Sequence, residues 1–244
     1  GKIRLCFNPD EEIARGVDKL DLKQFGARFA YTLDGAERGE ICHETFSADA
    51  AKLVIRGVSA HPGWAKDVMV NALRLAGRYL AALPMEQSPE RTAGTEGFIH
   101  PVTISGSAEE ATVSFIVRDF ELDGLAEKRA LMERLAADLR AAEPQARVEL
   151  TFTEQYRNMR YWLEKDMRPV EFARTAARRA GVEPFFQPIR GGTDGSRLTA
   201  RGLPTPNIFT GMHEVHSQRE WVTVQDMAKA ADTLVHLAQV WAGK

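Results

Sequence analysis

The sequence predicts an α/β domain interrupted by an inserted α+β domain of ferredoxin-like order, and two observations support this fold class. Residues 50–156 show the patterns of a strand, a helix, two strands, a helix and a strand, which is the order of a split β-α-β fold. The segment that follows alternates strands with helices, as a parallel α/β sheet does. We therefore expect residues 1–45 and 157–244 to form one domain around an insertion at 46–156.

The first half of the chain supplies the following elements. Residues 2–8 alternate and then turn apolar, which predicts a buried strand that ends at "NPDEE". The run "FAYTL" predicts a second strand, stopped by an Asp-Gly turn pair. In the insertion, residues 50–59 are rich in β-branched side chains and predict a strand. Apolar residues at helical spacing predict a helix over 66–83.

After a polar connector, the runs "FIHPVTISGS" and "ATVSFIVRDF" predict two strands of the insertion. An amphipathic helix over 124–142 and a strand over 146–156 complete it. The rest of the chain predicts a helix over 169–181, a strand "PFFQPI", a glycine-rich turn and a short helix. A strand "TPNIFTG", a loop with two histidines and a last helix over 223–241 follow.

The composition narrows the class of protein. The 244 residues are 44% hydrophobic and 27% charged, as is usual for a globular protein with a sizeable core. A net charge of -2 gives no basis for binding nucleic acid or an acidic membrane surface. No apolar stretch approaches the roughly 18 residues of a membrane span. Cys6 and Cys42 are too few for a disulfide framework, so we expect a reducing compartment, the cytoplasm.

Acidic side chains follow two of the predicted strands, where α/β sheets place ligand sites. Asp10, Glu11 and Glu12 are consecutive, and adjacent carboxylates point in different directions. One of them can therefore hold a metal ion while its neighbour acts as a general base towards water. The alternative is a solvated acidic turn. Asp34 ends the next strand, and an Asp before Gly is also ordinary turn chemistry.

Three histidines lie where they have a candidate role. His213 and His216 share the loop "FTGMHEVHSQREW", and a neutral imidazole is a common ligand of zinc. Either or both can reach one ion, so the pattern does not choose between them. His61, in the turn "SAHPGW" of the insertion, can donate a hydrogen bond to an oxyanion or be an ordinary loop residue. The other histidines are expected at the surface or in packing: His43, His100 and His236.

Two arginines are candidate anion-binding residues. Arg118 ends an apolar strand beside Asp119, and a structural ion pair is a sufficient explanation for it. Arg190 precedes a glycine pair, where the backbone can approach an anion and the guanidinium can form a fork with a carboxylate. The spacing is not that of a nucleotide-binding loop.

Six segments carry a resemblance to a known family: "NPDEEIARG", "AYTLDG", "GVSAHPGWAKDVMVNA", "IVRDF", "PIRGGTDGSRL" and "LPTPNIFTG" with a later histidine. In this order they resemble the peptidase T family, tripeptide aminopeptidases of the M20 group of dinuclear zinc exopeptidases. The resemblance covers essentially the whole chain. It implies an α/β catalytic domain with an inserted lid or dimerisation domain, two zinc ions, a small peptide substrate and a homodimer formed through the insertion.

The resemblance also implies roles for the acids and for one histidine. Glu11 matches the general base that deprotonates the metal-bound water. Glu12 matches a ligand of one zinc ion and Asp34 a ligand of the other. His216 matches the imidazole partner of Glu12, because the family's ligand precedes a short polar stretch and an acid, which is Glu220 here.

The resemblance assigns His61 as the lid histidine that stabilises the tetrahedral intermediate, and Arg118 and Arg190 as arginines that grip the substrate. The chain departs from the family in one respect, because it contains no His-x-Asp motif. Family members carry that motif upstream, with an aspartate that bridges the two ions. The chain is therefore expected to be the C-terminal part of a longer protein, inactive by itself or weak in metal binding.

Two alternatives stay open. One is a sister activity of the same group, such as a dipeptidase, an acylamino-acid deacylase or a carboxypeptidase. The other is a non-catalytic interaction module, in which residues 46–156 pair edge to edge with a second copy.

Overall fold

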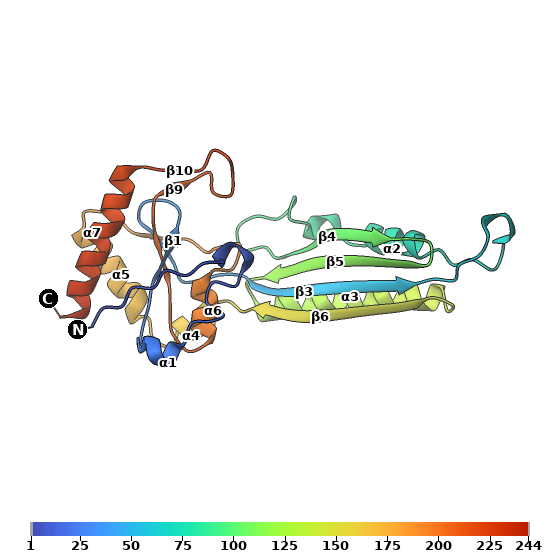
Figure 1. Ribbon diagram of the computed structural model, residues 1–244, viewed down its shortest axis with the longest axis horizontal. Helices are drawn as coiled ribbons and strands as arrows, with labels where there is room; N and C mark the ends of the chain where they lie inside the picture. Colours follow the sequence, from blue (N-terminus) through green and yellow to red (C-terminus); the bar gives the residue numbers. More distant parts are fainter. Residues whose placement is uncertain (1, 244) are drawn as a thin grey trace. The chain divides into compact units, whose positions relative to one another are not determined.

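The computed structural model describes residues 2–243, so Gly1 and Lys244 lie outside the described residues. The chain divides into two compact units (Figure 1). Unit 1 comprises Gly1–Thr45 and Tyr156–Lys244, and unit 2 comprises Phe46–Gln155. Among the described residues, every helix is too short or too polar to cross a membrane. The predicted α/β architecture with an inserted α+β unit is confirmed.

Unit 1 contains a mixed four-stranded sheet in the order β1-β8-β2-β7. Its strands are β1 (Thr32–Gly35), β2 (Glu40–Cys42), β7 (Phe185–Phe186) and β8 (Asn207–Phe209). Strand β8 is parallel to β1 and antiparallel to β2, and β2 is parallel to β7. Each strand is short, so most of the unit consists of helices and connecting loops.

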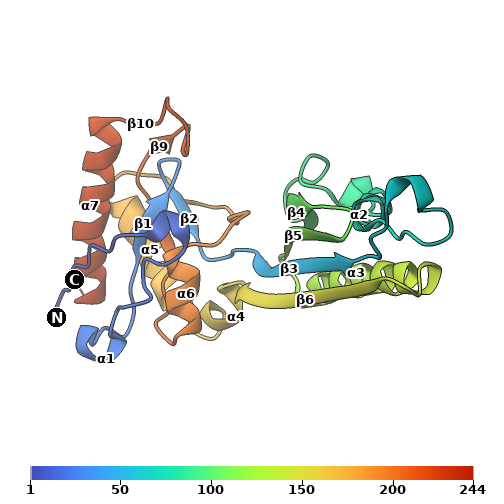
Figure 2. The same cartoon turned by 45° about the vertical axis from the view of Figure 1, so that its right-hand side comes forward.

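Two helices pack against this sheet, and the hydrophobic core of unit 1 lies between them and the sheet. They are α5 (Arg168–Arg179) and α7 (Val224–Trp241), which lie alongside one another in both views (Figures 1 and 2). Their alanines and leucines pack against Ile208 and Phe209 of β8, which are fully buried. The remaining short elements of unit 1 are η1 (Glu11–Ile13), α1 (Leu22–Phe25), α4 (Arg160–Leu163), α6 (Asp194–Ala200), β9 (Met212–His213) and β10 (Trp221–Val222).

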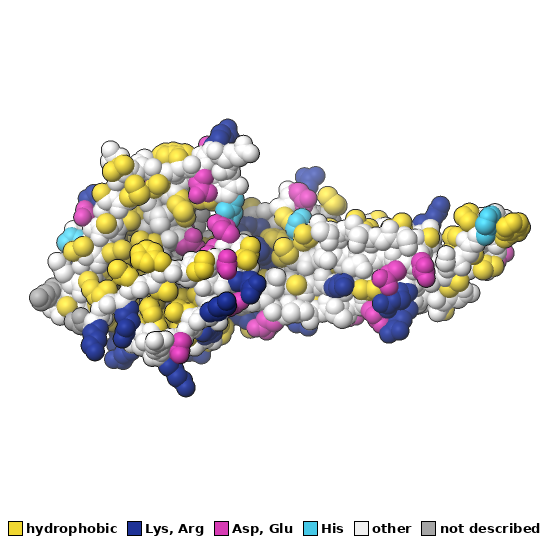
Figure 3. Space-filling view, in the orientation of Figure 1, with side chains coloured by type: hydrophobic (Ala, Val, Ile, Leu, Met, Phe, Trp, Pro, Cys, Tyr) yellow, Lys and Arg dark blue, Asp and Glu magenta, His cyan; other side chains and the backbone are white. Residues whose placement is uncertain are grey.

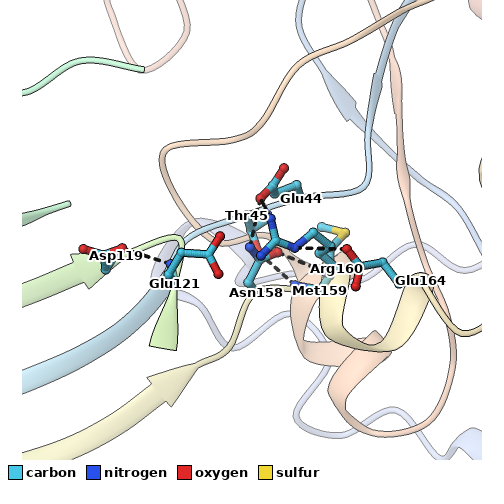
Figure 4. Close-up of polar contacts among 8 residues, drawn as sticks. All are labelled: Glu44, Thr45, Asp119, Glu121, Asn158, Met159, Arg160 and Glu164. Atoms are coloured by element: carbon cyan, nitrogen blue, oxygen red, sulfur yellow. Dashed lines mark hydrogen bonds and ion pairs between the residues drawn. The ribbon is translucent and has the colours of Figure 1, made fainter. Parts of the chain in front are cut away.

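A polar network holds the end of the β2 segment against α4 (Figure 4). The Thr45 N–H donates to Oδ1 of Asn158 at 3.1 Å, and Arg160 pairs with Glu44 at 2.7 Å. Asn158 is fully buried. A buried amide without hydrogen bonds would be costly, so these contacts specify how the two distant segments of unit 1 meet.

The prediction of a buried strand over residues 2–8 is wrong. These residues adopt no regular structure, and no strand among residues 2–243 pairs with them. Ile3, Leu5 and Phe7 are 72%, 80% and 93% exposed, and Figure 3 shows hydrophobic side chains gathered on this face of unit 1. An alternating pattern indicates which side chains share a face, but a strand also needs a partner to satisfy its backbone hydrogen bonds.

Unit 2 contains a four-stranded sheet in the order β4-β5-β3-β6. Its strands are β3 (Ser47–Arg56), β4 (Phe98–Gly106), β5 (Glu110–Asp119) and β6 (Arg147–Tyr156). Strand β5 is antiparallel to both β3 and β4. With one helix after β3 and another after β5, this is the predicted ferredoxin-like arrangement.

Helices α2 (Ala72–Ala81) and α3 (Leu122–Ala142) lie on one face of this sheet (Figures 1 and 2). Alternate residues of β5 are buried beneath them, including Phe115, which is 2% exposed. The predicted helix over 66–83 was too long, because the Asn71 side chain caps α2 by accepting the Arg74 N–H at 3.1 Å. The short helical turns of unit 2 are η2 (Pro62–Trp64) and η3 (Met85–Gln87).

Candidate metal and acid–base site

The acidic loop of unit 1, residues 8–16, contains a tight turn. Glu11 and Glu12 begin η1, and the residues that flank it, Asp10 and Ala14, have φ of 67° and 58°. Left-handed backbone costs a non-glycine residue about 1–2 kcal/mol. Such strain is characteristic of loops whose geometry serves a site.

Glu12 contacts His216, although the two residues lie near opposite ends of the chain. The distance from Nε2 of His216 to Oε2 of Glu12 is 2.9 Å, and both side chains are more than 70% exposed. Figure 3 shows histidine and acidic side chains together on this face of unit 1. The His216 N–H donates to the Glu220 carboxylate at 2.9 Å, which orients the loop between β9 and β10.

His213, the other candidate in the same loop, has a different environment. Its ring stacks on Trp221 with centroids 4.1 Å apart and planes 16° apart, in the register of the β9–β10 pair. The sequence pattern left His213 and His216 as alternatives. The structure brings the imidazole of His216 to Glu12, whereas that of His213 packs within the hairpin.

Asp34 lies in the same cluster, at the end of β1. The pKa of its carboxyl is raised to about 6, first by burial and then by the negative charges of Glu12 and Asp194, against the opposing effect of His216. Burial also raises the pKa of Glu11, and Asp34, Asp194 and Glu12 add to that effect. These carboxylates repel one another in a partly desolvated place, where a proton or a cation is stabilising.

The donor set fits a divalent metal only in part. Two ligand atoms, each ~2.1 Å from a tetrahedral zinc ion, lie about 3.4 Å apart, and the Glu12 and His216 atoms, at 2.9 Å, are within about 0.5 Å of that separation. Carboxylate and imidazole are both ligands that zinc accepts. Within residues 2–243, however, no group of three or more His, Cys, Asp or Glu side chains is arranged to hold an ion. The described residues supply a pair of ligands and a nearby carboxylate.

Asp194 is a member of the cluster that the sequence reasoning missed. It is the first residue of α6, is 4% exposed, and accepts a hydrogen bond from Asn8 of the acidic loop. The signal was present in "GGTDG", where an acid follows a glycine pair at the start of a helix. The sequence-based interpretation of this segment gave a role to Arg190 and the glycines, but none to the Asp194 carboxylate.

The glycine pair beside Arg190 serves packing at one of its two positions. A Cβ on Gly192 would lie 2.5 Å from the Tyr156 ring, whereas one on Gly191 would meet only Ile189, at 3.8 Å. Gly192 is therefore required by the aromatic ring, and the expected close approach to an anion does not explain it. Arg190 itself is partly buried in unit 1.

Unit 2 carries the other two candidate residues. Nδ1 of His61 accepts the Gly63 N–H at 3.1 Å, so the neutral ring carries its proton on Nε2. The ring also packs on Trp64, with centroids 4.4 Å apart. The Arg118 guanidinium lies 5.8 Å from the centre of the Phe98 ring. Asp119, expected as its ion-pair partner, pairs with Lys128 at 2.7 Å.

Comparison with known proteins gives the wider context. Residues 43–147 match the peptidase dimerisation domain. The whole chain is 46% identical over 246 residues to peptidase T of Aeromonas hydrophila, and 44% identical over 244 residues to peptidase T of Bacillus pumilus. In both cases the match covers 60% of the relative, so the chain spans that share of its relatives' length.

Solved structures show the same fold. An aminopeptidase PepT from Bacillus cereus matches 94% of this chain and 62% of its own, with a TM-score of 0.78 at 21% identity. A tripeptidase from Staphylococcus aureus matches 97% of this chain and 63% of its own, with a TM-score of 0.80 at 18% identity. A dinuclear metal-binding peptidase of the M20 family from Bacillus subtilis gives a TM-score of 0.68 at 18% identity, over 96% of this chain and 63% of its own.

Proposed function

We propose that this chain, a homologue of peptidase T with a peptidase dimerisation domain, forms part of a zinc-dependent M20 aminopeptidase that releases the N-terminal residue of tripeptides. The observation that carries the proposal is the 2.9 Å contact between Glu12 and His216 inside a cluster of carboxylates. A solvated acidic turn needs no imidazole partner from the other end of the chain.

In this proposal, Glu12 and His216 hold one zinc ion and Asp34 contributes to the other. Bound zinc supplies a Lewis acid that lowers the pKa of water and polarises a carbonyl. A catalytic zinc ion usually has three protein ligands, and this chain provides one or two for each ion. We therefore expect the chain alone to bind zinc weakly.

The remaining roles belong to proton transfer and substrate binding. Glu11 accepts a proton from the attacking water and later gives it to the leaving amine, which suits a carboxyl whose pKa is raised by burial. His61 presents Nε2–H, the donor that a developing oxyanion requires. Arg118 and Arg190 bind the carboxylate of the peptide, since guanidinium forms paired hydrogen bonds with that group.

We propose that this chain has no peptidase activity by itself, because the ligand set is incomplete. The test is hydrolysis of Leu-Gly-Gly with added Zn²⁺ or Co²⁺, measured by release of leucine. No turnover is expected. Turnover that disappears in Glu11→Ala would overturn the proposed inactivity and support the assignment of the base. Turnover that survives Glu11→Ala would contradict the proposed role of Glu11.

Unit 2 is proposed to form a homodimer through the exposed edge of its sheet. Strand β4 is an edge strand, and its Val102 and Ile104 are 49% and 51% exposed. The opposite edge, β6, instead carries charged Arg147 and Glu149, which discourage pairing. The mass in solution tests this proposal: the dimer is expected to become a monomer in Ile104→Lys. A monomeric parent chain would contradict it.

Both cysteines are free, with Cys6 exposed and Cys42 buried. An exposed free thiol is compatible with a reducing compartment, and this supports the proposal of a cytoplasmic location.

A second candidate function is a non-catalytic dimerisation module. It is favoured by the lack, within residues 2–243, of any three-ligand metal group. Calorimetry with Zn²⁺ separates the two candidates, because the module requires no binding of the ion, whereas the peptidase part requires binding that depends on Glu12 and His216.

A further inference from the structure

Asp194 contacts the acidic loop through its side chain. Oδ2 accepts a hydrogen bond from Nδ2 of Asn8, at the start of the loop. This hydrogen bond links the loop that carries the proposed base and the proposed metal ligand to the start of α6.

Gly16, Asn8 and Asp194 pack so closely that no side-chain atom fits at position 16. A Cβ added to Gly16, at the other end of the loop, would overlap both Oδ2 of Asp194 and Nδ2 of Asn8. The φ of Gly16 is not in the left-handed region, so the glycine is needed for this close approach and not for its own conformation. Both ends of the loop therefore meet at one carboxylate.

The Asp194 carboxylate is not needed to cap its own helix. Thr193 is the N-cap of α6, where its side chain accepts the Ser196 N–H and forms a reciprocal capping box. The second oxygen of Asp194, Oδ1, is buried and has no hydrogen-bond partner among the residues that the structure describes. Burying a carboxylate oxygen in this way costs free energy. The hydrogen bond from Asn8 to Oδ2 offsets part of this free-energy cost.

The acidic loop has little support of its own. Asp10 and Ala14 are in the left-handed region, and the turn contains two backbone hydrogen bonds, from the Ala14 N–H to Glu11 and from the Arg15 N–H to Asp10. The Glu12 side chain is 72% exposed. A strained and exposed turn of this kind relaxes unless another part of the fold holds it.

We propose that Asp194 is a positioning residue, which anchors the loop of residues 8–16 on α6 so that Glu11 and Glu12 face Asp34 and His216. The role of the anchored loop in peptide hydrolysis rests on the proposed function, but the anchoring itself does not. The carboxylate of Asp194 acts through the loop, by its hydrogen bond with Asn8.

The test observes the His216 imidazole in the metal-free chain by NMR at fixed pH. Glu12→Gln alters the contact directly and defines the signal of a disturbed pair. Asp194→Ala is expected to shift the His216 signals in the same direction as Glu12→Gln. Asp194→Asn keeps an oxygen that can accept from Asn8, so it is expected to stay close to the parent chain. Unchanged His216 signals in Asp194→Ala would overturn the proposal.

Two further variants keep the test decisive. If Asp194→Ala does not fold, Asn8→Ala removes the same anchor from the exposed side of the contact and is expected to give the same shift. Tyr31→Phe is the control for a lost, partly buried hydrogen bond, because the Tyr31 hydroxyl donates to the Pro169 carbonyl at 2.9 Å. It is expected to leave the His216 signals in place. An equal shift in Tyr31→Phe would show a general loss of packing and contradict the anchoring role.

Zinc binding separates this proposal from the proposed function. Loss of a residue that orients metal ligands typically weakens metal affinity about 10–100-fold, and Asp194→Ala is expected to fall in that range. If the parent chain binds no Zn²⁺ while Asp194→Ala still shifts His216, the metal role fails and the anchor stands. If both chains bind Zn²⁺ equally and His216 does not shift, the anchor fails and the metal role stands.

Discussion

The two units differ in how much of their structure consists of long regular elements and how much depends on contacts between segments that are distant in the sequence. The sheet of unit 2 has strands of 9–10 residues and a core closed by two helices on one face. The sheet of unit 1 has strands of 2–4 residues, and its apolar N-terminal segment is exposed. The candidate site lies in unit 1, where residues from both ends of the chain meet. Long regular elements build the insertion, and contacts between distant loops build the site.

If the units are independent, each should unfold in its own step. Phe115→Ala removes a ring that is 2% exposed in the core of unit 2 and is expected to cost about 3–5 kcal/mol of the free energy of unfolding of that unit. Hydrogen exchange resolved by segment measures the loss. Amides of α7 in unit 1 should keep their protection.

The matched variant in unit 1 is Phe209→Ala, since Phe209 is also fully buried. It should lower protection in unit 1 alone, by a similar amount. A loss of protection that spreads over both units in either variant would show that they unfold together.

The adjacent glycines before α6 give a smaller effect with a built-in control. Gly192→Ala forces a methyl group against the Tyr156 ring and should cost about 1–3 kcal/mol of stability. Gly191→Ala has room for the methyl group and should change stability by less than about 0.5 kcal/mol. Denaturant unfolding of both variants measures the difference. Equal effects would mean that Gly192 is not a packing residue.

Surface charges of unit 2 should have the smallest effect. Arg56 pairs with Glu110 at 2.7 Å and Glu149 at 3.3 Å, and all three side chains are 39–49% exposed. Arg56→Ala should cost at most about 1 kcal/mol of stability, and less in high salt. Lys128→Ala should cost more, because Lys128 and its partner Asp119 are each only 12% exposed. The reverse order would contradict this assignment of the two ion pairs.

The sequence predicted unit 2 well because its long strands and amphipathic helices carry enough residues to show a period. Prediction from the sequence failed where the structure of a segment depends on contact with another segment far away in the sequence. Residues 2–8 have the pattern of a strand, but no strand within residues 2–243 pairs with them, and β2 (Glu40–Cys42) is too short to show any pattern.

The candidate site was predicted in part, for the same reason. The acids at positions 11, 12 and 34 stood out as charges at strand ends, whereas the choice between His213 and His216 depends on a hairpin that only the structure shows. Asp194 stayed hidden because its partner Asn8 is far away in the sequence. The pattern of residue types along the sequence does not reveal which side chains come into contact in the folded protein.

The central claim is that Glu12 and His216 share a divalent cation, and calorimetric titration of the chain with Zn²⁺ tests it most directly. The account predicts measurable binding that becomes more than about tenfold weaker in Glu12→Gln and in His216→Gln, and stays unchanged in His213→Gln. Binding that is the same in all four proteins, or binding that is lost only with His213, would contradict it.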